Sequence, residues 1–219
     1  MKIVPILSSN PAFCKRILNN TSVKTTDGKL ESVNFVEYEP TDNDDFIQIN
    51  KIENSWKTAR FIEQIAKNFR DSCMQIFAND SLHPCCNRYY GIETKDGDTL
   101  SIAETFDYSK LETHNDNDNF LEINYIQTNP RDKYLPDKAS KKRYKGLGEA
   151  LVCEIVKLAC TQKQNLINIT SANEGFWKKS TLFKEIGGDD NDDCGEIERV
   201  LLQSDFDEYI NYVEDKKTV

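Results

Sequence analysis

The 219-residue chain lacks any long hydrophobic run, and it contains only two histidines, two methionines and two tryptophans. A membrane-crossing helix needs about 20 consecutive apolar residues, so we expect no membrane association. The N-terminal stretch MKIVPILSSNPAFCKRIL has a single lysine before a short apolar run that Pro5 interrupts, which argues against a signal peptide. These absences predict a cytoplasmic protein.

The seven cysteines also lack a regular spacing. Cys85 and Cys86 are adjacent and His83 is nearby, but no second cysteine pair at zinc-finger spacing accompanies them. We therefore predict no metal site and expect reduced, free thiols.

The chain has no excess of positive charge. It contains 37 Asp and Glu and 28 Lys and Arg, which gives a net charge of −9. Such acidity argues against nucleic acid or an anionic membrane as the main partner. The length suits a single domain over 1–219, with 1–30 as an N-terminal extension that is hard to place and 204–219 as a C-terminal helix. An aromatic content of 10% favours a folded protein over a disordered one.

Periodicity predicts a mixture of strands and helices. Strands are expected at 33–40, 46–52, 87–94, 99–106, 120–130, 165–170, 182–186 and 197–203. Asp96-Gly97 predicts a hairpin, since glycine accepts a positive φ. A helix from Ile52 to about Arg70, capped by Asn54 or Ser55, is predicted from apolar residues at steps of three and four. That stripe consists of Ile52, Trp56, Ala59, Ile62, Ala66 and Phe69.

Positive charge is concentrated in residues 131–148, which hold seven Lys or Arg against two Asp. An apolar helix predicted over 149–162 follows directly. The first amides of a helix lack intrahelical partners, and the helix dipole adds partial positive charge there. Gly146 and Gly148 let a ligand approach the backbone without a Cβ atom. The stretch therefore predicts a phosphate-binding turn.

The glycine pattern of this turn matches neither of two common phosphate motifs. A P-loop needs Gly-Lys-Ser/Thr, and the dinucleotide fingerprint needs a third glycine. The turn instead has the form R-x-x-G-x-G over residues 143–148, between a strand and a helix. In that setting it resembles the central motif of the GNAT (Gcn5-related N-acetyltransferase) superfamily, Q/R-x-x-G-x-G/A.

Two flanking segments strengthen the resemblance. LEINYIQTNP resembles the family's fourth strand, which commonly ends in a hydrophobic-x-Val-x-Pro pattern, and NITSANEGFWKKS resembles the fifth strand and the Asn…Phe-Tyr-x-Lys segment after it. The likeness covers residues 87–203 well and 33–86 more loosely. It implies a GNAT-like α+β fold in α/β/α layers. The central sheet would be mixed and mostly antiparallel, with one βαβ crossover and a splayed strand pair that forms the acyl-CoA cleft.

The resemblance implies acetyl-CoA as the acyl donor. Its diphosphate would lie on the amides of the 143–148 turn, and its pantetheine arm along the edge of the fourth strand. The residues assigned to donor binding on this basis are Ile126, Gln127, Thr128, Arg143, Tyr144, Lys145, Gly146, Leu147, Gly148, Glu149, Asn173 and Trp177.

Direct acyl transfer to an amine needs a base, a donor for the developing oxyanion, and a proton or donor for the leaving thiolate. Glu122 is the first candidate for the base and Glu104 the second. A strand amide at 127–128 is the candidate oxyanion donor.

The sequence departs from the family's pattern in two places. Residues 131–142 form an insertion before the glycine turn, which we expect to fold over the donor or the substrate mouth. The family's usual tyrosine is replaced by Trp177, or by Lys184 in a second register, and an indole N–H is no general acid at neutral pH. Tyr125 or solvent would then protonate the thiolate.

The sequence thus predicts an N-acetyltransferase that moves an acetyl group from acetyl-CoA to a primary amine of a small molecule, an amino acid or a protein. The alternative is a non-catalytic module that uses the same cleft as an acyl-CoA sensor or an interaction surface. RNA binding by the basic stretch is a third hypothesis, which the overall acidity argues against. The oligomeric state stays open, with a strand-mediated homodimer as one alternative.

Overall fold

The structure is a computed structural model, and it describes residues 16–57, 59–78, 86–111, 119–130, 144–171, 182–187 and 197–218. The described strands form one sheet in the order β6-β1-β2-β3-β4-β5-β7-β9-β8. Their bounds are β1 Arg16–Thr25, β2 Leu30–Tyr38, β3 Asn87–Glu93, β4 Thr99–Asp107, β5 Phe120–Thr128, β6 Tyr144–Lys145, β7 Leu166–Ser171, β8 Lys184–Gly187 and β9 Ile197–Leu202.

Within this sheet, β5 and β7 run parallel and the other described neighbours run antiparallel. Parallel neighbours need a crossover connection, and the helix α4 (Leu147–Gln162) supplies it between β5 and β7. The predicted mixed, mostly antiparallel sheet with one βαβ crossover is therefore confirmed.

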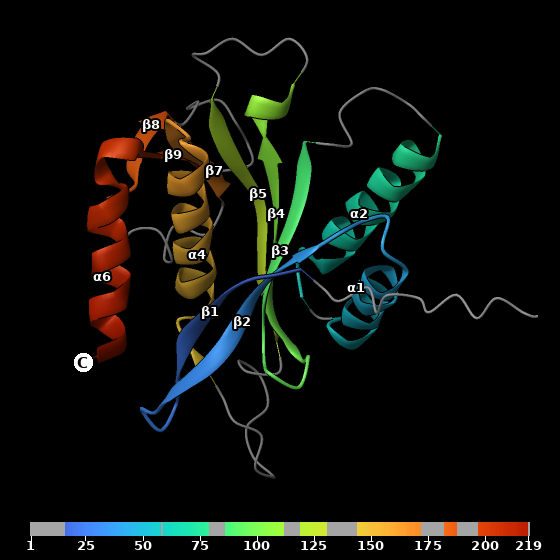
Figure 1. Ribbon diagram of the computed structural model, residues 1–219, viewed down its shortest axis with the longest axis horizontal. Coiled ribbons are helices and arrows are strands. Elements are labelled where there is room, and N and C mark those ends of the chain that lie inside the picture. Colours follow the sequence, from blue (N-terminus) through green and yellow to red (C-terminus); the bar gives the residue numbers. More distant parts are fainter. Residues whose placement is uncertain are drawn as a thin grey trace, which may run out of the picture.

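Helices cover both faces of the sheet (Figure 1). On one face α1 (Asn43–Ser55) and α2 (Ile62–Phe77) pack through a core that includes Ile65, Phe69 and Tyr89. On the other face α4 and the C-terminal helix α6 (Phe206–Thr218) pack through a larger core that includes Leu151 and Tyr209. Two short 3₁₀ turns, η1 (Tyr108–Lys110) and η3 (Gln203–Asp205), follow β4 and β9. The predicted α/β/α layering is confirmed.

The strand predicted at 46–52 is wrong, because these residues belong to α1. Ile49 and Ile52 are buried three residues apart on one helical face, whereas Ile47 is 56% exposed. Asp42 caps the helix by accepting hydrogen bonds from the amides of Asp44 and Asp45.

The single helix predicted from Ile52 to Arg70 is also wrong, since α1 ends at Ser55 and α2 begins at Ile62. Asn54 and Ser55 cap nothing at an N-terminus; their side chains donate back to the carbonyls of Asn50 and Ile52 in the last turn of α1. The apolar stripe of the prediction is nevertheless buried throughout, because the chain turns between two helices that face the same side of the sheet.

Most of the remaining elements agree with the prediction. β3 and β4 form the expected hairpin, and Gly97 in its turn has a φ of +84°. β5, β7, β8, β9 and the C-terminal helix lie where the pattern placed them. α4 begins at Leu147, two residues before the predicted start. The strand β1 had no predicted counterpart.

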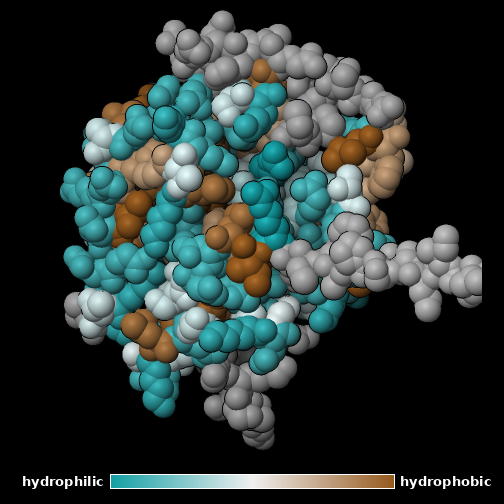
Figure 2. Space-filling model, viewed as in Figure 1, coloured by the Kyte–Doolittle hydropathy of each residue, from teal (hydrophilic) through white to brown (hydrophobic). Residues whose placement is uncertain are grey.

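Hydrophilic side chains cover most of the face seen in Figure 2, with hydrophobic residues scattered among them in small groups. Among the described helices, none combines the length and the hydropathy that a membrane crossing requires.

Candidate active site

The parallel strands β5 and β7 separate partway along their length. They pair from Phe120 opposite Leu166 to Ile123 opposite Ile169. Beyond this point β5 continues to Thr128 on β4, while β7 follows β9. The far part of β5 therefore has no β7 partner within the described sheet. The splayed strand pair expected from the sequence is present.

A β-bulge lies at the point of separation. Glu104 of β4 pairs with Tyr125, and the next β4 residue, Thr105, pairs with Ile123, so Asn124 is the extra residue of β5. A bulge bends its strand and re-aims the side chains around it. The Asn124 side chain forms a hydrogen bond with the Glu104 carboxyl.

Glu104 is held in a buried polar cluster next to this bulge, with 2% of its surface exposed. The Asn68 side-chain amide of α2 donates to both Glu104 carboxylate oxygens, at 3.0 and 2.9 Å. The Gln64 side-chain amide, one turn earlier on α2, donates to the side-chain oxygen of Asn68 at 2.7 Å and fixes the orientation of the Asn68 amide. Burial raises the pKa of the Glu104 carboxyl to about 7, against the opposing effect of the Asn68 and Asn124 amides. Such a group can take up or release a proton near neutral pH.

Glu122 lies on the other side of the bulge, where β5 and β7 are still paired. It is half-buried and stands opposite Phe106 on β4 and Asn168 on β7. The Tyr108 hydroxyl donates to its carboxylate at 2.9 Å. Burial and Glu122 raise the pKa of Tyr108 to about 12, so this tyrosine stays protonated at neutral pH.

The predicted residues at the far end of β5 face opposite sides of the sheet. Tyr125 packs against Phe61 at the start of α2, with ring centroids 5.5 Å apart. The Gln127 side-chain oxygen accepts a hydrogen bond from the Phe61 amide at 3.3 Å. Ile126 packs on the α4 side. This part of β5 is therefore anchored to the connection between α1 and α2.

The glycine turn leads into α4 as a left-handed cap. Gly146 is the N-cap, with a φ of +68°, and its carbonyl accepts from the Ala150 amide at 2.8 Å. No described side chain caps this end of the helix. Just before it, Tyr144 and Lys145 form β6 and pair with Thr25 and Lys24 of β1. The turn thus presents the α4 N-terminus in the form expected of an anion site.

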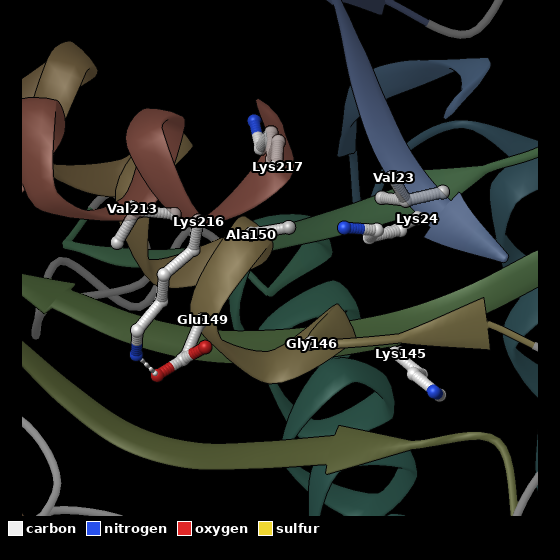
Figure 3. A pocket seen from close by; sticks show the side chains of 9 residues that line it. All are labelled: Val23, Lys24, Lys145, Gly146, Glu149, Ala150, Val213, Lys216 and Lys217. Carbon is white, nitrogen blue, oxygen red and sulfur yellow. Dashed lines mark hydrogen bonds and ion pairs between the residues drawn. The ribbon is translucent and has the colours of Figure 1, made fainter. Parts of the chain in front are cut away.

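A pocket of about 290 Å³ adjoins this turn (Figure 3). It lies between β1, β6, the start of α4 and the end of α6. Its polar lining comes from Lys24, Lys145, Gly146, Glu149, Lys216 and Lys217. The Lys216 ammonium reaches across to the Glu149 carboxylate, at 2.8 Å.

The structure thus brings Glu104, Tyr125 and 126–128 to one end of β5, and it places 144–149 at the α4 N-terminus. Glu122 lies apart from the first group, in the paired section of β5. Three further predicted residues, Arg143, Asn173 and Trp177, lie outside the described residues, as does the insertion 131–142. The roles of all these residues stay predictions.

Sequence reasoning missed the polar partners of Glu104. Asn68 and Gln64 stand four residues apart on α2, a spacing that puts them on one helical face. That spacing was the available signal, but it did not indicate which carboxyl they approach. The lysines of α6 and β1 that line the pocket were missed as well.

One cluster contains the residue types of a metal site, but its carboxylates already form ion pairs with lysines. Ligand atoms of Cys153, Glu154 and Glu214 lie within 4.8 Å of one another. The Lys157 ammonium, however, lies 2.8 Å from Glu154 and 2.7 Å from Glu214, and Lys217 lies 2.9 Å from Glu214. The two carboxylates are therefore neutralised by ammonium groups in a network that joins α4 to α6.

At the level of sequence, neither a protein-family model nor a curated protein matches the chain. Solved structures share its fold at low identity. A protein assigned to the GNAT acetyltransferase family from Desulfovibrio desulfuricans has a TM-score of 0.53 and 14% identity over 78% of this chain and 99% of its own. A chimera of the spermidine N-acetyltransferase SpeG from Vibrio cholerae and hSSAT has a TM-score of 0.53 and 14% identity, over 80% of this chain and 97% of its own.

An uncharacterized protein from Bacillus halodurans has a TM-score of 0.57 and 14% identity over 92% of this chain and 99% of its own. Identities this low establish the fold and nothing finer. The chain has the fold of the GNAT acetyltransferases, which confirms the fold that the glycine turn and its flanking strands implied.

Proposed function

We propose that the protein is an N-acyltransferase that moves an acyl group, with acetyl as the first candidate, from acyl-coenzyme A directly to a primary amine. The observation that carries the proposal is the buried Glu104 carboxyl at the Asn124 bulge, where β7 leaves β5. The fold supports it, because the neighbours with this fold include a spermidine N-acetyltransferase chimera and a protein assigned to the GNAT acetyltransferases.

The described residues suit a donor that carries a diphosphate and an amide-rich arm. The α4 N-terminus has a left-handed glycine cap and no side-chain cap among the described residues, so its first amides can bind phosphate oxygens. Backbone groups of β5 at 126–128 lie beyond the last β7 pair and can bond the amides of the arm. Arg143, Asn173 and Trp177 are assigned to the donor by resemblance alone.

Among the described residues of the turn, Glu149 carries a charge that opposes a bound anion. Its ion pair with Lys216 reduces this opposition, because the ammonium lies 2.8 Å from the carboxylate. The donor site is therefore completed by α6, a helix that follows the last strand of the sheet.

When bound, the coenzyme supplies a thioester carbonyl that an amine can attack. Glu104 is our candidate for the group that removes the proton of the incoming ammonium, because a carboxyl with a pKa of about 7 matches the pH at which it must work. We assign oxyanion stabilisation to a β5 amide at 127–128. Tyr125, on the same face as Glu104, is the candidate proton donor to the thiolate.

Glu122 is the competing candidate for the base. Its carboxylate already accepts the Tyr108 hydroxyl, and it lies where β5 and β7 remain paired rather than where they separate. We therefore rank Glu104 first, which reverses the order predicted from the sequence.

The decisive experiment is to measure coenzyme A binding by calorimetry, together with release of free thiol from acetyl-CoA across a panel of amines. Wild type should bind the coenzyme and turn over at least one amine, and Glu104→Gln should bind equally well with turnover reduced at least a hundredfold. Absence of coenzyme binding would refute the proposal. Binding without turnover on any amine would instead favour the non-catalytic acyl-CoA module. We propose a reducing cytoplasmic location, which suits the free thiols of Cys73, Cys86, Cys153 and Cys160.

A further inference from the structure

We propose that the pocket between β1, β6, α4 and α6 binds a phosphate monoester. We name this pocket the lysine pocket after Lys24, Lys145, Lys216 and Lys217, which line it. This assignment goes beyond the diphosphate of the proposed donor, because it concerns a second phosphate group on the α6 side of α4.

The charge balance of the lysine pocket favours an anion. Four lysines line it against one glutamate, Glu149, in a chain whose net charge is −9. Lys216 pairs with Glu149, and Lys217 pairs with Glu214. Lys24 and Lys145 form no ion pair with any of the described residues. Two positive charges are thus left for a ligand to neutralise.

The sheet places these two lysines on adjacent strands. Lys24 of β1 and Lys145 of β6 are direct partners in the antiparallel pairing. Like charges that stand directly opposite in a sheet destabilise it. The pairing of β1 with β6 extends over only two residues, and beside the lysines the Tyr144 hydroxyl donates to Glu31 at 3.1 Å. An anion bound beside the two lysines would reduce the repulsion between them.

The walls and the size of the lysine pocket narrow the class of ligand. Val23, Ala150 and Val213 supply apolar wall, which lowers the local dielectric and strengthens the attraction between a lysine and a phosphate. A volume of about 290 Å³ is at the lower limit of small-molecule sites, which begin at roughly 300 Å³. It therefore suits a phosphate and the sugar carbon that carries it rather than a whole nucleotide.

Two sources share this chemistry. One is the phosphate monoester on the ribose of coenzyme A, since Lys145 and Gly146 belong both to the glycine turn and to the lysine pocket; this source rests on the proposed function. The other is a free phosphate ligand that binds independently of the donor.

The test compares wild type with Lys24→Gln/Lys145→Gln, which keeps the length of both side chains and removes both charges. Lys29→Gln is the matched control, because Lys29 lies on the neighbouring β1–β2 turn, is 82% exposed in its side chain and pairs with Asp27 outside the pocket. Calorimetry measures inorganic phosphate, coenzyme A and 3′-dephospho-coenzyme A on each protein, and thermal unfolding is recorded with and without phosphate.

We expect the double variant to lose at least tenfold in phosphate affinity while Lys29→Gln binds as wild type. Without phosphate, the double variant should melt above wild type because the repulsion is gone, and phosphate should raise only the wild-type melting temperature. If the double variant melts below wild type without phosphate, it has a folding defect. That result would also contradict the argument that the two lysines repel each other.

The coenzyme titrations identify the source. If the ribose phosphate is bound, wild type prefers coenzyme A to its dephospho form and the double variant does not. If the ligand is a free phosphate, neither protein distinguishes coenzyme A from its dephospho form, while the phosphate affinity still depends on the two lysines. If the protein binds phosphate but no coenzyme, the acyltransferase proposal is wrong, whereas the proposal of a phosphate site in the lysine pocket stands. Equal phosphate affinities in wild type and the double variant would overturn the lysine pocket.

Discussion

The side-chain nitrogen of Asn68 lies 3.0 and 2.9 Å from the two carboxylate oxygens of Glu104, so one amide of α2 bridges a buried carboxyl on β4. This contact stabilises the ionised form of a group that burial would otherwise keep neutral. The pKa of Glu104 is therefore about 7, which lies between the pKa of an ordinary surface carboxyl and that of a fully desolvated one. Because Glu104 changes its charge near pH 7, we expect both the activity and the folding stability of the protein to depend on pH in this range.

We first predict that Glu104→Gln removes a pH dependence of folding stability. The folded pKa of about 7 lies above the ordinary value of 4.5, so the contribution of Glu104 to stability is fully present below pH 4.5 and is lost as the pH rises through 7. The loss amounts to about 3 kcal/mol. Chemical unfolding at pH 5 and pH 8 should show wild type losing stability over this range relative to Glu104→Gln.

The same variant should lose acyl transfer, whereas Glu122→Gln should keep most of it. This pair of results would assign the proton to Glu104. Equal loss of turnover in both variants, or retention of activity by Glu104→Gln, would contradict the assignment and return Glu122 to first place.

A second prediction concerns Asn68→Ala. The Asn68 amide lowers the pKa of Glu104, so its removal should move that pKa upward from about 7. The acidic limb of the rate profile should therefore shift to higher pH, with the maximal rate at high pH largely kept. The measurement is the rate of thiol release against pH at saturating amine.

The control for Asn68→Ala is Asn54→Ala, an exposed asparagine whose amide bonds only a carbonyl in the last turn of α1. Its rate profile should match wild type. An unshifted profile in Asn68→Ala would mean that Glu104 does not govern the rate.

The sequence contained most of the fold but little of the Glu104 cluster. Strands bounded by Pro130 or by Asp96-Gly97 were predicted because turn residues fix their ends locally. The strand β1 was missed because most of its side chains are polar and only Val23 and Thr25 of its residues are buried, which leaves no apolar alternation to detect. Asp42 before an acidic first turn was the local signal for α1, but the prediction of a strand at 46–52 did not take it into account.

The position of Glu104 depends on the pairing register rather than on local pattern. Asn68 and Glu104 are 36 residues apart in the chain, and Asn124 is directed at Glu104 by a one-residue bulge. A register shift of one residue moves side chains to the opposite face of a sheet, and no periodicity in a single strand reveals where the shift occurs. The prediction from the sequence therefore ranked Glu122 before Glu104 without any knowledge of these contacts.

Our third prediction uses the left-handed cap of α4. A Cβ at Gly146 would meet only the Glu149 carboxylate oxygen, at an ordinary contact distance of 3.7 Å, so the cost of a side chain is conformational. Gly146→Ala should lower the free energy of unfolding by about 1 kcal/mol, and Gly146→Asn by less, because asparagine tolerates a positive φ. Urea unfolding distinguishes the two.

Gly146→Asp then tests the turn as an anion site with Gly146→Asn as its isosteric partner. The two should have similar stability, whereas the added carboxylate should weaken coenzyme A binding at least tenfold relative to asparagine. Equal affinities in the two variants would show that the phosphate groups do not lie at this turn.

The last prediction concerns Lys157, which ties α4 to α6. Burial lowers the pKa of Lys157, but its hydrogen bonds to Glu154 and Glu214 outweigh this effect and hold the pKa above its usual value. Lys157→Gln would leave Glu154, which is 1% exposed, with Asn19 as its remaining described hydrogen-bond donor. Removing one partner of a buried ion pair costs about 3 kcal/mol or more, since the other charge stays desolvated.

Lys157→Gln/Glu154→Gln should recover much of that loss, because no buried charge is then left unpaired. Lys29→Gln, which breaks a fully exposed pair with Asp27, should leave the unfolding midpoint unchanged within error. Urea unfolding of these proteins, with Glu154→Gln added to complete the double-mutant cycle, measures the coupling. If the double variant is less stable than Lys157→Gln, the unpaired-charge argument is wrong and Glu154 is stabilised by Asn19 rather than by Lys157.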